Sequence, residues 1–460
     1  MKHLTHCVGI DLARKAQSKA VIASYPFDLD EMPKRAFAFS HDVEGFQALH
    51  AHILKIVGAN SLKDVAINME PTGPWRDVSS FFQNQGAAVF FTRTDVVSEV
   101  RKAHSRYAKT DRIDSFTLAG MPRIFPKRMI PFTPREERLE ILSQYASQRF
   151  QIVKDVTRWK NRLLARLELV WKPLLVSLED EAVFTQSMRA FWKRFPHPAD
   201  LIQLGSKRFS TWFESHMHGA LTPQMEEILW NAGIKAECLW TLLRKGAGER
   251  ETLCWMIVRD LNIISGLEKQ QEAIEKEIEK ARKKVPECPL VDEIPGVGPV
   301  VSVNLASVLS PASRFSNTRK CSAYTGLVCR KKSSGEKEIL GLRITKAGNR
   351  RIKRDLVLAA DVAMHRDPQL AAFAIRLLTA GKHYNKVRVA VGRKIAVRAY
   401  SLLKRYERGE KNVHYEFRDL KGQPVSEQEA KALAQTLWLK YRDHEKRTIP
   451  AEQKRKPAGS

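Results

Sequence analysis

Short apolar runs alternate with amphipathic stretches through the first 130 residues of the chain. The apolar runs predict buried strands at 7–11, 20–23, 36–39, 65–70 and 88–92. Apolar residues at helical spacing predict one helix over 43–57, which Asp42 would cap, and another near 75–85. Strands that alternate with helices in this way are typical of a layered α/β domain, which we assign to residues 1–130.

A helical pattern replaces this alternation over residues 131–285. The segment from Glu136 to Trp171 is predicted to be one long amphipathic helix, which Pro173 would stop. A second stripe of apolar residues at three-four spacing begins at Ile257 and ends at Ile278, and its outer face is charged. Two such helices predict an antiparallel coiled-coil arm with a smaller helical insertion between them. A plain helical bundle fits the same pattern equally well.

Residues 286–408 form a third, mostly helical region, followed by a polar tail over 409–460. Its helices are expected near 300–309, 350–365, 369–379 and 385–408. No apolar run in the chain reaches the roughly 18 residues that a membrane-spanning helix needs. The start of the sequence carries no apolar signal region, so we expect a soluble intracellular protein.

The charge of the chain points to nucleic acid. The sequence has 78 lysines and arginines against 51 aspartates and glutamates, which gives a net charge of +27. Between Ser310 and Arg408 there are 24 basic residues and only six acidic ones. Basic charge this concentrated favours a surface that contacts phosphates over a merely solubilising surface. The six cysteines form no C-x-x-C pair, so neither a structural zinc site nor a disulfide framework is expected.

Four acidic residues stand out within this basic chain. Asp11 and Glu70 each come at the end of a predicted buried strand, so they would lie at the carboxyl edge of one sheet, where α/β folds place their sites. Asp111 and Asp114 are three residues apart at the start of a predicted helix and would share one face. Four carboxylates on one rim can hold one or two Mg²⁺ ions, which prefer oxygen ligands and phosphate partners. Each acid taken alone could equally well start a turn or cap a helix.

The segments around these acids resemble the motifs of a known protein family. Gly9-Ile10-Asp11, Glu70-Pro71-Thr72-Gly73 and Lys109-Thr110-Asp111-Arg112-Ile113-Asp114 resemble the DEDD-type transposases of a bridge-RNA-guided bacterial insertion-sequence family, which is related to the Piv-type DNA invertases. The resemblance implies a RuvC-like, RNase H-type fold for the first domain. It also implies that Asp11, Glu70, Asp111 and Asp114 form a catalytic tetrad that binds Mg²⁺.

Two motifs in the basic region are candidates for phosphate contact. Gly296 and Gly298 precede a predicted helix, where exposed backbone N–H groups can cradle a phosphate, although a simple turn into the helix explains them as well. Ser333 and Ser334 lie beside a glycine among several cations, which would stabilise charge developing on phosphorus. From the residues alone, a flexible loop whose cations touch backbone phosphates is the simpler interpretation.

The resemblance changes this second interpretation. The second domain of the same family has a G-L … S-G … S-K-x-G-x-x-x-x-R pattern whose serine is the nucleophile. The matching segments here are Tyr324-Thr325-Gly326-Leu327, Ser334-Gly335 and Thr345-Lys346-Ala347-Gly348-Asn349-Arg350, which implies that Ser334 is the nucleophile, with Ser333 as a one-residue ambiguity. The residues that we expect to hold nucleic acid are Arg330, Lys331, Lys332, Lys346, Arg350, Arg351, Gly296 and Gly298.

The expected function is therefore DNA transposition or recombination through a phosphoserine intermediate. Its partners would be donor and target DNA and a structured bridge RNA, and the resemblance implies a homodimer or homotetramer in the bacterial cytoplasm, associated with the nucleoid. A Piv-like site-specific invertase and a RuvC-like junction nuclease that cuts by hydrolysis are the alternatives. A non-enzymatic nucleic-acid-binding protein, in which the acids are structural, is a third.

Overall fold

The chain divides into two compact units, residues 1–134 and 135–460. The computed structural model describes residues 4–27, 35–58, 60–104, 110–179, 182–217, 223–243, 247–328, 333–334, 337–338, 344–345 and 348–448. Within these ranges the protein is mostly helical, with one mixed sheet in the first unit. The predicted combination of an α/β domain with helical regions is confirmed at this level. No helix of the described ranges is long and apolar enough to cross a membrane.

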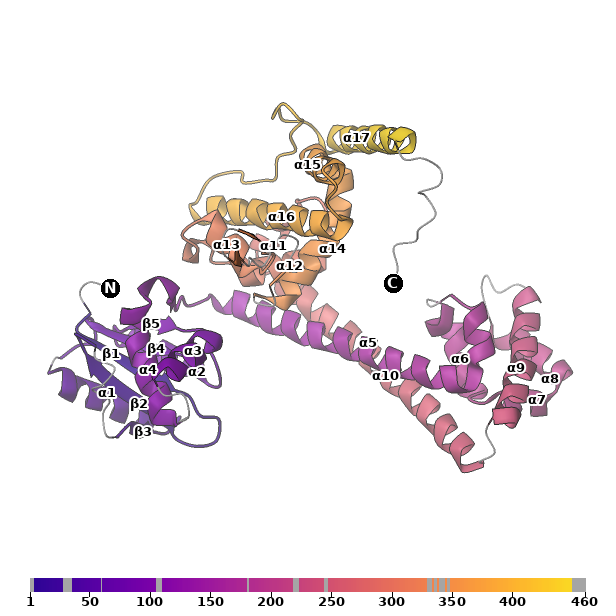
Figure 1. The fold of residues 1–460 in the computed structure, drawn as a ribbon, viewed down its shortest axis with the longest axis horizontal. Helices are drawn as coiled ribbons and strands as arrows, with labels where there is room; N and C mark the ends of the chain where they lie inside the picture. The colour runs from indigo at the N-terminus through magenta and orange to yellow at the C-terminus, as the bar shows by residue number, and fades with distance from the viewer. Residues whose placement is uncertain are drawn as a thin grey trace. The chain divides into compact units, whose positions relative to one another are not determined.

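A six-stranded sheet forms the centre of the first unit (Figure 1). Its order is β3-β2-β1-β4-β5-β6, in which β1, β4 and β5 run parallel, whereas β2 is antiparallel to both of its neighbours and β6 is antiparallel to β5. The strands are β1 (His6–Asp11), β2 (Ser18–Ser24), β3 (Phe37–Phe39), β4 (Val65–Met69), β5 (Ala88–Phe91) and β6 (Ile130–Pro131).

Helices cover both faces of this sheet. They are α1 (Val43–Val57), α2 (Trp75–Asn84), α3 (Thr94–His104) and α4 (Asp111–Ile124). Val8 and Ile10 of β1 share a buried cluster with α1 and α2. The residue between them, Gly9, faces α4, because successive strand residues point to opposite faces. The predicted cap of α1 is confirmed, since the Asp42 carboxylate accepts a hydrogen bond from the backbone N–H of Gly45 at 2.7 Å.

Two long helices, α5 (Glu137–Ser177) and α10 (Ala247–Arg282), pair along the second unit (Figure 1). Ion pairs between the two helices show in which direction they run relative to each other. Arg149 bonds Glu275 at 2.7 Å and Lys160 lies 3.2 Å from Glu268, so rising residue numbers on α5 meet falling numbers on α10. The two helices are therefore antiparallel, as the sequence predicts.

The predicted end of the first long helix at Pro173 is wrong. Helix α5 continues to Ser177, and the chain leaves helical geometry only locally, at Trp171, where φ is −120° and ψ is 26°. Proline lacks the N–H of a helical hydrogen bond, which accounts for a kink. The side chains of Trp171 and Leu174 are fully buried in the neighbouring aromatic core, so packing holds the helix together past the kink.

Short helices between α5 and α10 enclose that aromatic core. They are α6 (Gln186–Arg194), α7 (Pro198–Leu204), α8 (Ser206–His216) and α9 (Pro223–Leu243), with a 3₁₀ turn at Ala182–Phe184. Phe191, Trp192 and Phe195 are fully buried; Phe191 and Trp192 contact each other and Trp171 edge-on, and Phe195 packs against Phe191 at a tilt. These helices correspond to the predicted insertion.

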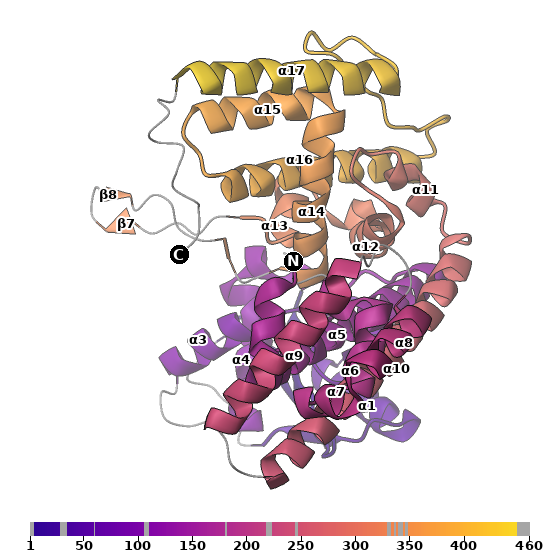
Figure 2. The same ribbon diagram turned by 90° about the vertical axis from the view of Figure 1, so that its right-hand side faces the viewer.

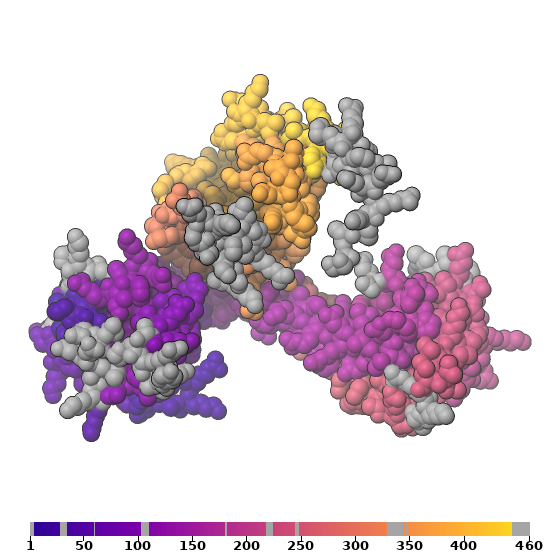
Figure 3. Space-filling view, viewed as in Figure 1, coloured from indigo at the N-terminus to yellow at the C-terminus, as the bar shows by residue number. Residues whose placement is uncertain are grey.

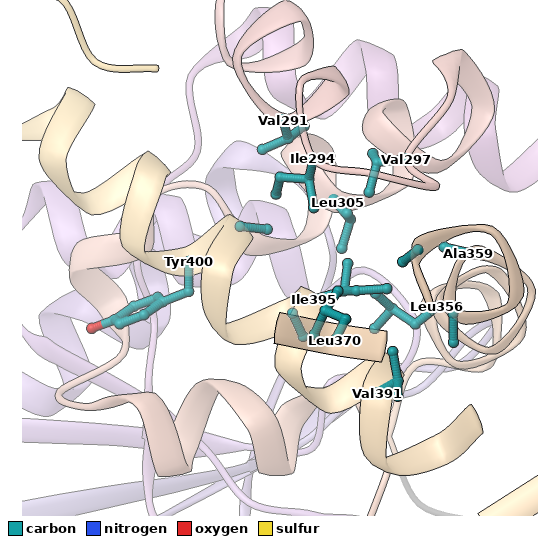
Figure 4. Packing of buried hydrophobic residues seen from close by; sticks show 14 of the residues in the cluster. Val291, Ile294, Val297, Leu305, Leu356, Ala359, Leu370, Val391, Ile395 and Tyr400 are labelled. Atoms are coloured by element: carbon teal, nitrogen blue, oxygen red, sulfur yellow. The ribbon is translucent and has the colours of Figure 1, made fainter. Parts of the chain in front are cut away.

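The remaining helices surround a second apolar core (Figure 4). They are α11 (Glu287–Asp292), α12 (Pro299–Leu309), α13 (Thr318–Tyr324), α14 (Arg350–Arg366), α15 (Pro368–Thr379), α16 (Tyr384–Glu407) and α17 (Glu427–Thr448), with a 3₁₀ turn at Ala312–Arg314. Figure 4 shows Leu356 of α14, Val391 of α16 and Leu370 of α15 in this cluster. A hairpin of two short strands, β7 (Ser333–Ser334) and β8 (Lys337–Glu338), lies outside this cluster (Figure 2).

Helix α17 lies in the segment that the sequence analysis assigns to a polar tail. It packs on α14 and α15, where Figure 2 shows it beside α15. Ala434 and Trp438 are buried, and the Trp438 indole N–H donates to the Met364 carbonyl at 2.7 Å. A few well-placed apolar residues are therefore enough to dock a helix that is otherwise charged.

Candidate catalytic and nucleic-acid-binding sites

Two of the four predicted acids lie at the same edge of the sheet. Asp11 is the last residue of β1, and Glu70 directly follows β4. Strands β1 and β4 are parallel, and Ile10 of β1 pairs with Met69 of β4. Asp11 and Glu70 are the next residues along each segment, so they occupy equivalent positions in the two strands. The shared register brings both to the carboxyl edge that the sequence predicts.

Helix α4 presents its first turn at the same edge. Gly9 makes this possible, since a Cβ atom there would lie only 1.9 Å from the Ser115 carbonyl oxygen. The hydroxyl of Ser115 donates at 3.0 Å to the backbone carbonyl of Lys19, whose strand partner is Asp11. Asp114 directly precedes Ser115, so the turn that carries both predicted aspartates begins beside the end of β1.

A buried amide fixes α4 against the sheet farther along its length. The Asn68 side chain of β4 donates to the Leu118 carbonyl at 2.7 Å and to the Thr92 hydroxyl at 2.9 Å. Asn68 was not among the predicted residues, although a polar side chain inside the apolar run 65–69 was a usable signal. Buried polar groups are normally hydrogen-bonded. Here the hydrogen bond to Leu118 fixes the position of α4 along β4.

The two aspartates of α4 differ in their surroundings. Asp111 is the first helical residue and is exposed, and the Thr110 side chain caps the helix before it. Asp114 is largely buried and accepts two hydrogen bonds from Arg101 of α3, at 3.0 and 3.2 Å. No local pattern in the sequence marks Arg101, because its partnership depends on how α3 packs on α4.

The donor chemistry of this edge fits a hard divalent cation. All four candidate ligands are carboxylates, which Mg²⁺ prefers, and three structural elements bring them to one end of the sheet. Among the described residues, however, no three acidic, histidine or cysteine side chains lie close enough to enclose a metal ion. Asp114 is instead turned to Arg101, and the protein positions the four acids without closing them into a cage.

The second candidate site is the segment that carries the serines. Val328 and Thr345 flank it, and the Thr345 N–H donates to the Val328 carbonyl at 2.9 Å. Gly348, at φ +88°, lies against Gly326, since a Cβ there would be 2.6 Å from the Gly326 Cα. The Gly326 and Gly348 segments, far apart in sequence, therefore meet at the base of the serine segment.

Ser334 lies in β7, where it pairs with Lys337 of β8, and Ser333 precedes it in the same strand. The predicted cations Arg330, Lys331, Lys332 and Lys346 lie outside the described residues. Arg350 is described, at the start of α14, close in sequence to the point where the serine segment rejoins the helices.

Helices α14 and α16 form a shallow cationic hollow near this base, with a volume of about 430 Å³. Its lining residues are Arg350, Lys353, Arg354, Val357, Leu358 and Arg388. Lys353 donates to the Thr345 carbonyl at 2.8 Å, and burial together with nearby Arg350 lowers the pKa of its amine. The Arg388 guanidinium bonds Asp361 at 2.5 Å, while its buried Nε has no partner among the described residues. Four of the six residues that line this hollow are basic, which makes it a candidate for contact with phosphates.

Three other predicted contacts have different surroundings. Arg351 is buried and donates to the Ser143 carbonyl of α5 at 3.1 Å, so its guanidinium is engaged within the protein. Gly296, at φ +80°, allows a close approach to α14, because a Cβ there would be 2.2 Å from the Ala359 carbonyl oxygen. Gly298 caps α12 and has open space around it. Their predicted phosphate contacts stay predictions.

Comparison with known families gives two matches along the chain. Residues 8–172 match a family described as a transposase, whose model is named for the DEDD tetrad and the insertion sequence IS110. Residues 288–374 match the family described as transposases of the IS116/IS110/IS902 family. The first match contains all four acids, and the second contains Ser334 and the cationic residues of α14.

Two curated proteins are similar to the chain. The insertion element IS110 uncharacterized 43.6 kDa protein of Streptomyces coelicolor is 24% identical over 286 residues, which are 62% of this chain and 68% of that protein. The transposase for insertion sequence element IS1111A of Coxiella burnetii is 30% identical over 136 residues, which are 29% of this chain and 37% of that protein.

Proposed function

We propose that the chain is a transposase-recombinase that exchanges DNA strands at specific sites, because two of its segments match transposase families of the IS110 group. The observation that carries this proposal is the common sheet edge shared by Asp11, Glu70 and the first turn of α4. Four acids at one edge of a protein with a net charge of +27 are suited to metal-assisted chemistry on phosphates.

In this proposal the first unit has a RuvC-like, RNase H-type fold and holds Mg²⁺ through Asp11, Glu70, Asp111 and Asp114. The mixed sheet, with antiparallel β2 between β1 and β3 and parallel β4 and β5 beyond, supports that fold. The metal, when bound, would supply positive charge to the oxygens of the scissile phosphate. Arg101 would act as a positioning residue, because it fixes the carboxylate of Asp114.

Ser334 would be the nucleophile. Its Oγ would form a bond to the scissile phosphorus while the bond from phosphorus to the 3′ oxygen breaks. The proton that serine loses balances the proton that the leaving 3′ oxygen gains. A 3′-hydroxyl of a partner strand would then reverse the step on the new junction, so no external energy source is needed. Cations of α14, together with Arg330, Lys331, Lys332 and Lys346, would hold the backbone phosphates.

The resemblance to a guided family supports a structured bridge RNA as the partner that selects DNA sites. It also supports a homodimer or homotetramer, for which the paired helices α5 and α10, as a coiled coil, would be the assembling element. The protein would then act in the bacterial cytoplasm, on nucleoid DNA.

A plasmid assay with the DNA that flanks the gene tests this function. We expect the parent protein to produce rejoined junctions between element ends and target, and the Asp11→Asn and Ser334→Ala variants to produce none. Cut ends without junctions, made equally well by Ser334→Ala, would instead identify a hydrolytic nuclease. Inversion between repeats without excision or insertion would identify an invertase.

A further inference from the structure

An alternating ladder of arginines and tryptophans lies on the surface of the paired helices α5 and α10. The Arg162 guanidinium lies 4.6 Å from the centre of the Trp159 ring on α5. Arg259 of α10 lies between two indoles, 5.6 Å from the Trp159 ring and 5.0 Å from the Trp255 ring. We call Arg162, Trp159, Arg259 and Trp255 the tryptophan ladder.

The centre of the tryptophan ladder is held in place from below. The carboxylate of Asp260 is fully buried and accepts hydrogen bonds from Arg259, at 3.0 and 3.3 Å, and from Arg166 of α5. A buried charge is tolerated only when it is paired, so Asp260 fixes the guanidinium of Arg259 between the two rings. The ladder is therefore preorganised before anything binds to it.

The outer end of the ladder is open to solvent. Trp255 is 61% exposed, whereas the other eight tryptophans, all within the described residues, are buried or half-buried. A cation–π contact at an exposed site contributes only about 0.5–1 kcal/mol, less than burying an indole would. Internal stability therefore does not account for leaving Trp255 exposed, which is typical of a binding residue.

A row of cations on α5 extends from the ladder. Lys154, Arg158, Arg162 and Arg166 are each four residues apart, so they form one inclined row about 18 Å long. We call these four residues the cation row. Lys154, Arg158 and Arg162 are exposed, and Arg158 also pairs with Asp155 at 2.8 Å. In the space-filling view the surface of α5 is open along the middle of its length (Figure 3).

The cation row begins beside the cationic hollow of α14. Lys154 lies 5.6 Å from the ring centre of Phe150 on α5, and Arg354, which lines the hollow, lies 5.2 Å from the same ring. Both sites belong to the second unit, so their relation is fixed within one compact body. A basic and aromatic surface therefore runs from the α14 hollow along α5 to the exposed indole of Trp255.

From this continuity we propose that the tryptophan ladder and the cation row bind single-stranded nucleic acid, with an unpaired base stacked on the exposed indole of Trp255 and phosphates along Lys154, Arg158 and Arg162. Every base has a π-face that can stack on an indole or a guanidinium, and unstacked bases occur in single strands, not in duplexes. On this face of the paired helices a second copy of the chain is the less favoured occupant, because a symmetric contact here would bring the same cations together, so assembly through α5 and α10 would use another face. The proposal takes its class of partner from the proposed function.

The test measures binding of labelled single-stranded oligodeoxyadenosine and oligoadenosine, and of a duplex of equal length, by fluorescence anisotropy. We expect Trp255→Ala to weaken single-strand binding about 5- to 100-fold and to leave duplex binding unchanged. Trp255→Phe should retain most of the affinity, whereas Trp255→Leu, which keeps the apolar bulk without a π-face, should lose it. A preference for one oligonucleotide identifies the strand as DNA or as RNA, and equal binding assigns the surface to both.

Matched controls separate stacking from charge and from folding. Leu243→Ala changes a residue of α9 that is 69% exposed, and it should bind single strands like the parent. The double variant Lys154→Ala/Arg158→Ala should lower the slope of log K against log salt by about 1.4, because two phosphate contacts are lost. The exposed pair Lys207 and Arg208 on α8, changed in the same way, should leave the slope unchanged.

Two results would overturn the proposal. One is parental single-strand affinity in Trp255→Ala, and the other is parental affinity in Trp255→Leu, which would indicate an apolar protein contact. A change in oligomeric state of Trp255→Ala, with unaltered strand binding, would assign the surface to a second copy. The catalytic variant Asp11→Asn should bind single strands like the parent, so failure of strand exchange and failure of this proposal are separate outcomes.

Discussion

At the scale of single residues, the four acids are held in different ways, and this bears on the chemistry proposed for them. Asp11 ends β1 and Glu70 directly follows the adjacent parallel strand β4, so the register of the two strands sets where both acids leave the sheet. Asp114 is set by its ion pair with Arg101, and Asp111 is exposed at the start of α4. The strand acids are thus placed by the pairing of β1 with β4, and we expect their replacement to change chemistry more than fold.

Asp11→Asn should abolish strand exchange, a loss of at least about 100-fold, while DNA binding and its dependence on salt persist. The amide keeps the shape of the side chain but removes the negative charge that a cation needs, and removing an acid does not weaken contacts to phosphates. The control is Asp77→Asn, an exposed acid at the start of α2, which should exchange strands like the parent. Strand exchange by Asp11→Asn with Mg²⁺ as the only divalent ion would contradict the assignment.

Removal of divalent ions should have the same effect as removal of the carboxylate. In EDTA we expect no recombinant junctions, an unchanged circular dichroism spectrum and nearly unchanged DNA binding, because the sheet register does not depend on a metal. Addition of Mg²⁺ should restore the junctions. Full activity in EDTA would show that the four acids serve structure instead of catalysis.

At the scale of elements, contact between α4 and β1 depends on the absence of a side chain at Gly9. Gly9→Ala places a methyl group where the Ser115 carbonyl oxygen stands, so either the helix or the strand must move. We expect a loss of roughly 3 kcal/mol in the free energy of unfolding of the first unit, together with loss of activity. Gly266→Ala in α10, where a Cβ meets no atom within 4 Å, should instead stabilise the protein by up to about 1 kcal/mol. Thermal unfolding of both variants measures the contrast.

The start of α7 predicts a pH dependence. His197 is buried, and its Nδ1 accepts a hydrogen bond from the Ala199 N–H, which requires a neutral ring nitrogen. Burial, aided by Arg250, lowers the pKa of His197 to about 4, against the opposing effect of Asp200. A lowered folded-state pKa means that stability is complete above the unfolded value near 6.5 and falls as the pH drops toward 4, by at most about 3 kcal/mol.

The variant His197→Asn tests that interpretation. Asparagine can cap α7 without titrating, so the difference in unfolding free energy between parent and variant should change as the pH falls from 6.5 to 4. Urea unfolding followed by tryptophan fluorescence measures this difference. A constant difference over that range would mean that the pKa of His197 is the same in the folded and unfolded states.

Local sequence signals predicted elements well where one face is strongly apolar or a cap is distinct. The helix over 43–57 with Asp42 as its cap is confirmed residue for residue. The end of α5 was predicted wrongly, because Pro173 is a local signal and the burial of Trp171 and Leu174 that overrides it is tertiary. Helix α17 was missed for a related reason, since its docking depends on a few buried residues, Ala430, Ala434 and Trp438, in a charged segment.

At the scale of the whole molecule, the second unit is larger than the basic region that the sequence marks. Helix α12 packs on α5, Arg351 bonds the Ser143 carbonyl, and α17 covers α14 and α15. A fragment of residues 135–460 should therefore fold and bind DNA with a steep inverse dependence on salt. A fragment of residues 285–408 should unfold at a lower temperature, because it leaves these apolar contacts open. Equal melting temperatures of the two fragments would contradict the interpretation that residues 135–460 fold as one unit.

The candidate site was predictable in part. Asp11 and Glu70 end apolar runs that predict buried strands, and parallel pairing of these strands brings both acids to the same edge of the sheet. The partners Asn68, Arg101 and Arg388 were not predictable, because each depends on a neighbour that is distant in sequence. The proposed role of Ser334 comes from a resemblance of motifs, and what the structure adds is that two of these motifs meet at Gly326 and Gly348.

The most direct measurement of the central claim is a search for DNA linked covalently to Ser334. A substrate with a nick that blocks rejoining should accumulate a protease-sensitive protein–DNA adduct in denaturing gels, because the serine oxygen replaces water as the attacking group. The adduct should be absent with Ser334→Ala and present with Ser333→Ala, and its peptide should carry phosphate on Ser334. Cleaved ends without any adduct, or an adduct that persists in Ser334→Ala, would contradict the phosphoserine mechanism.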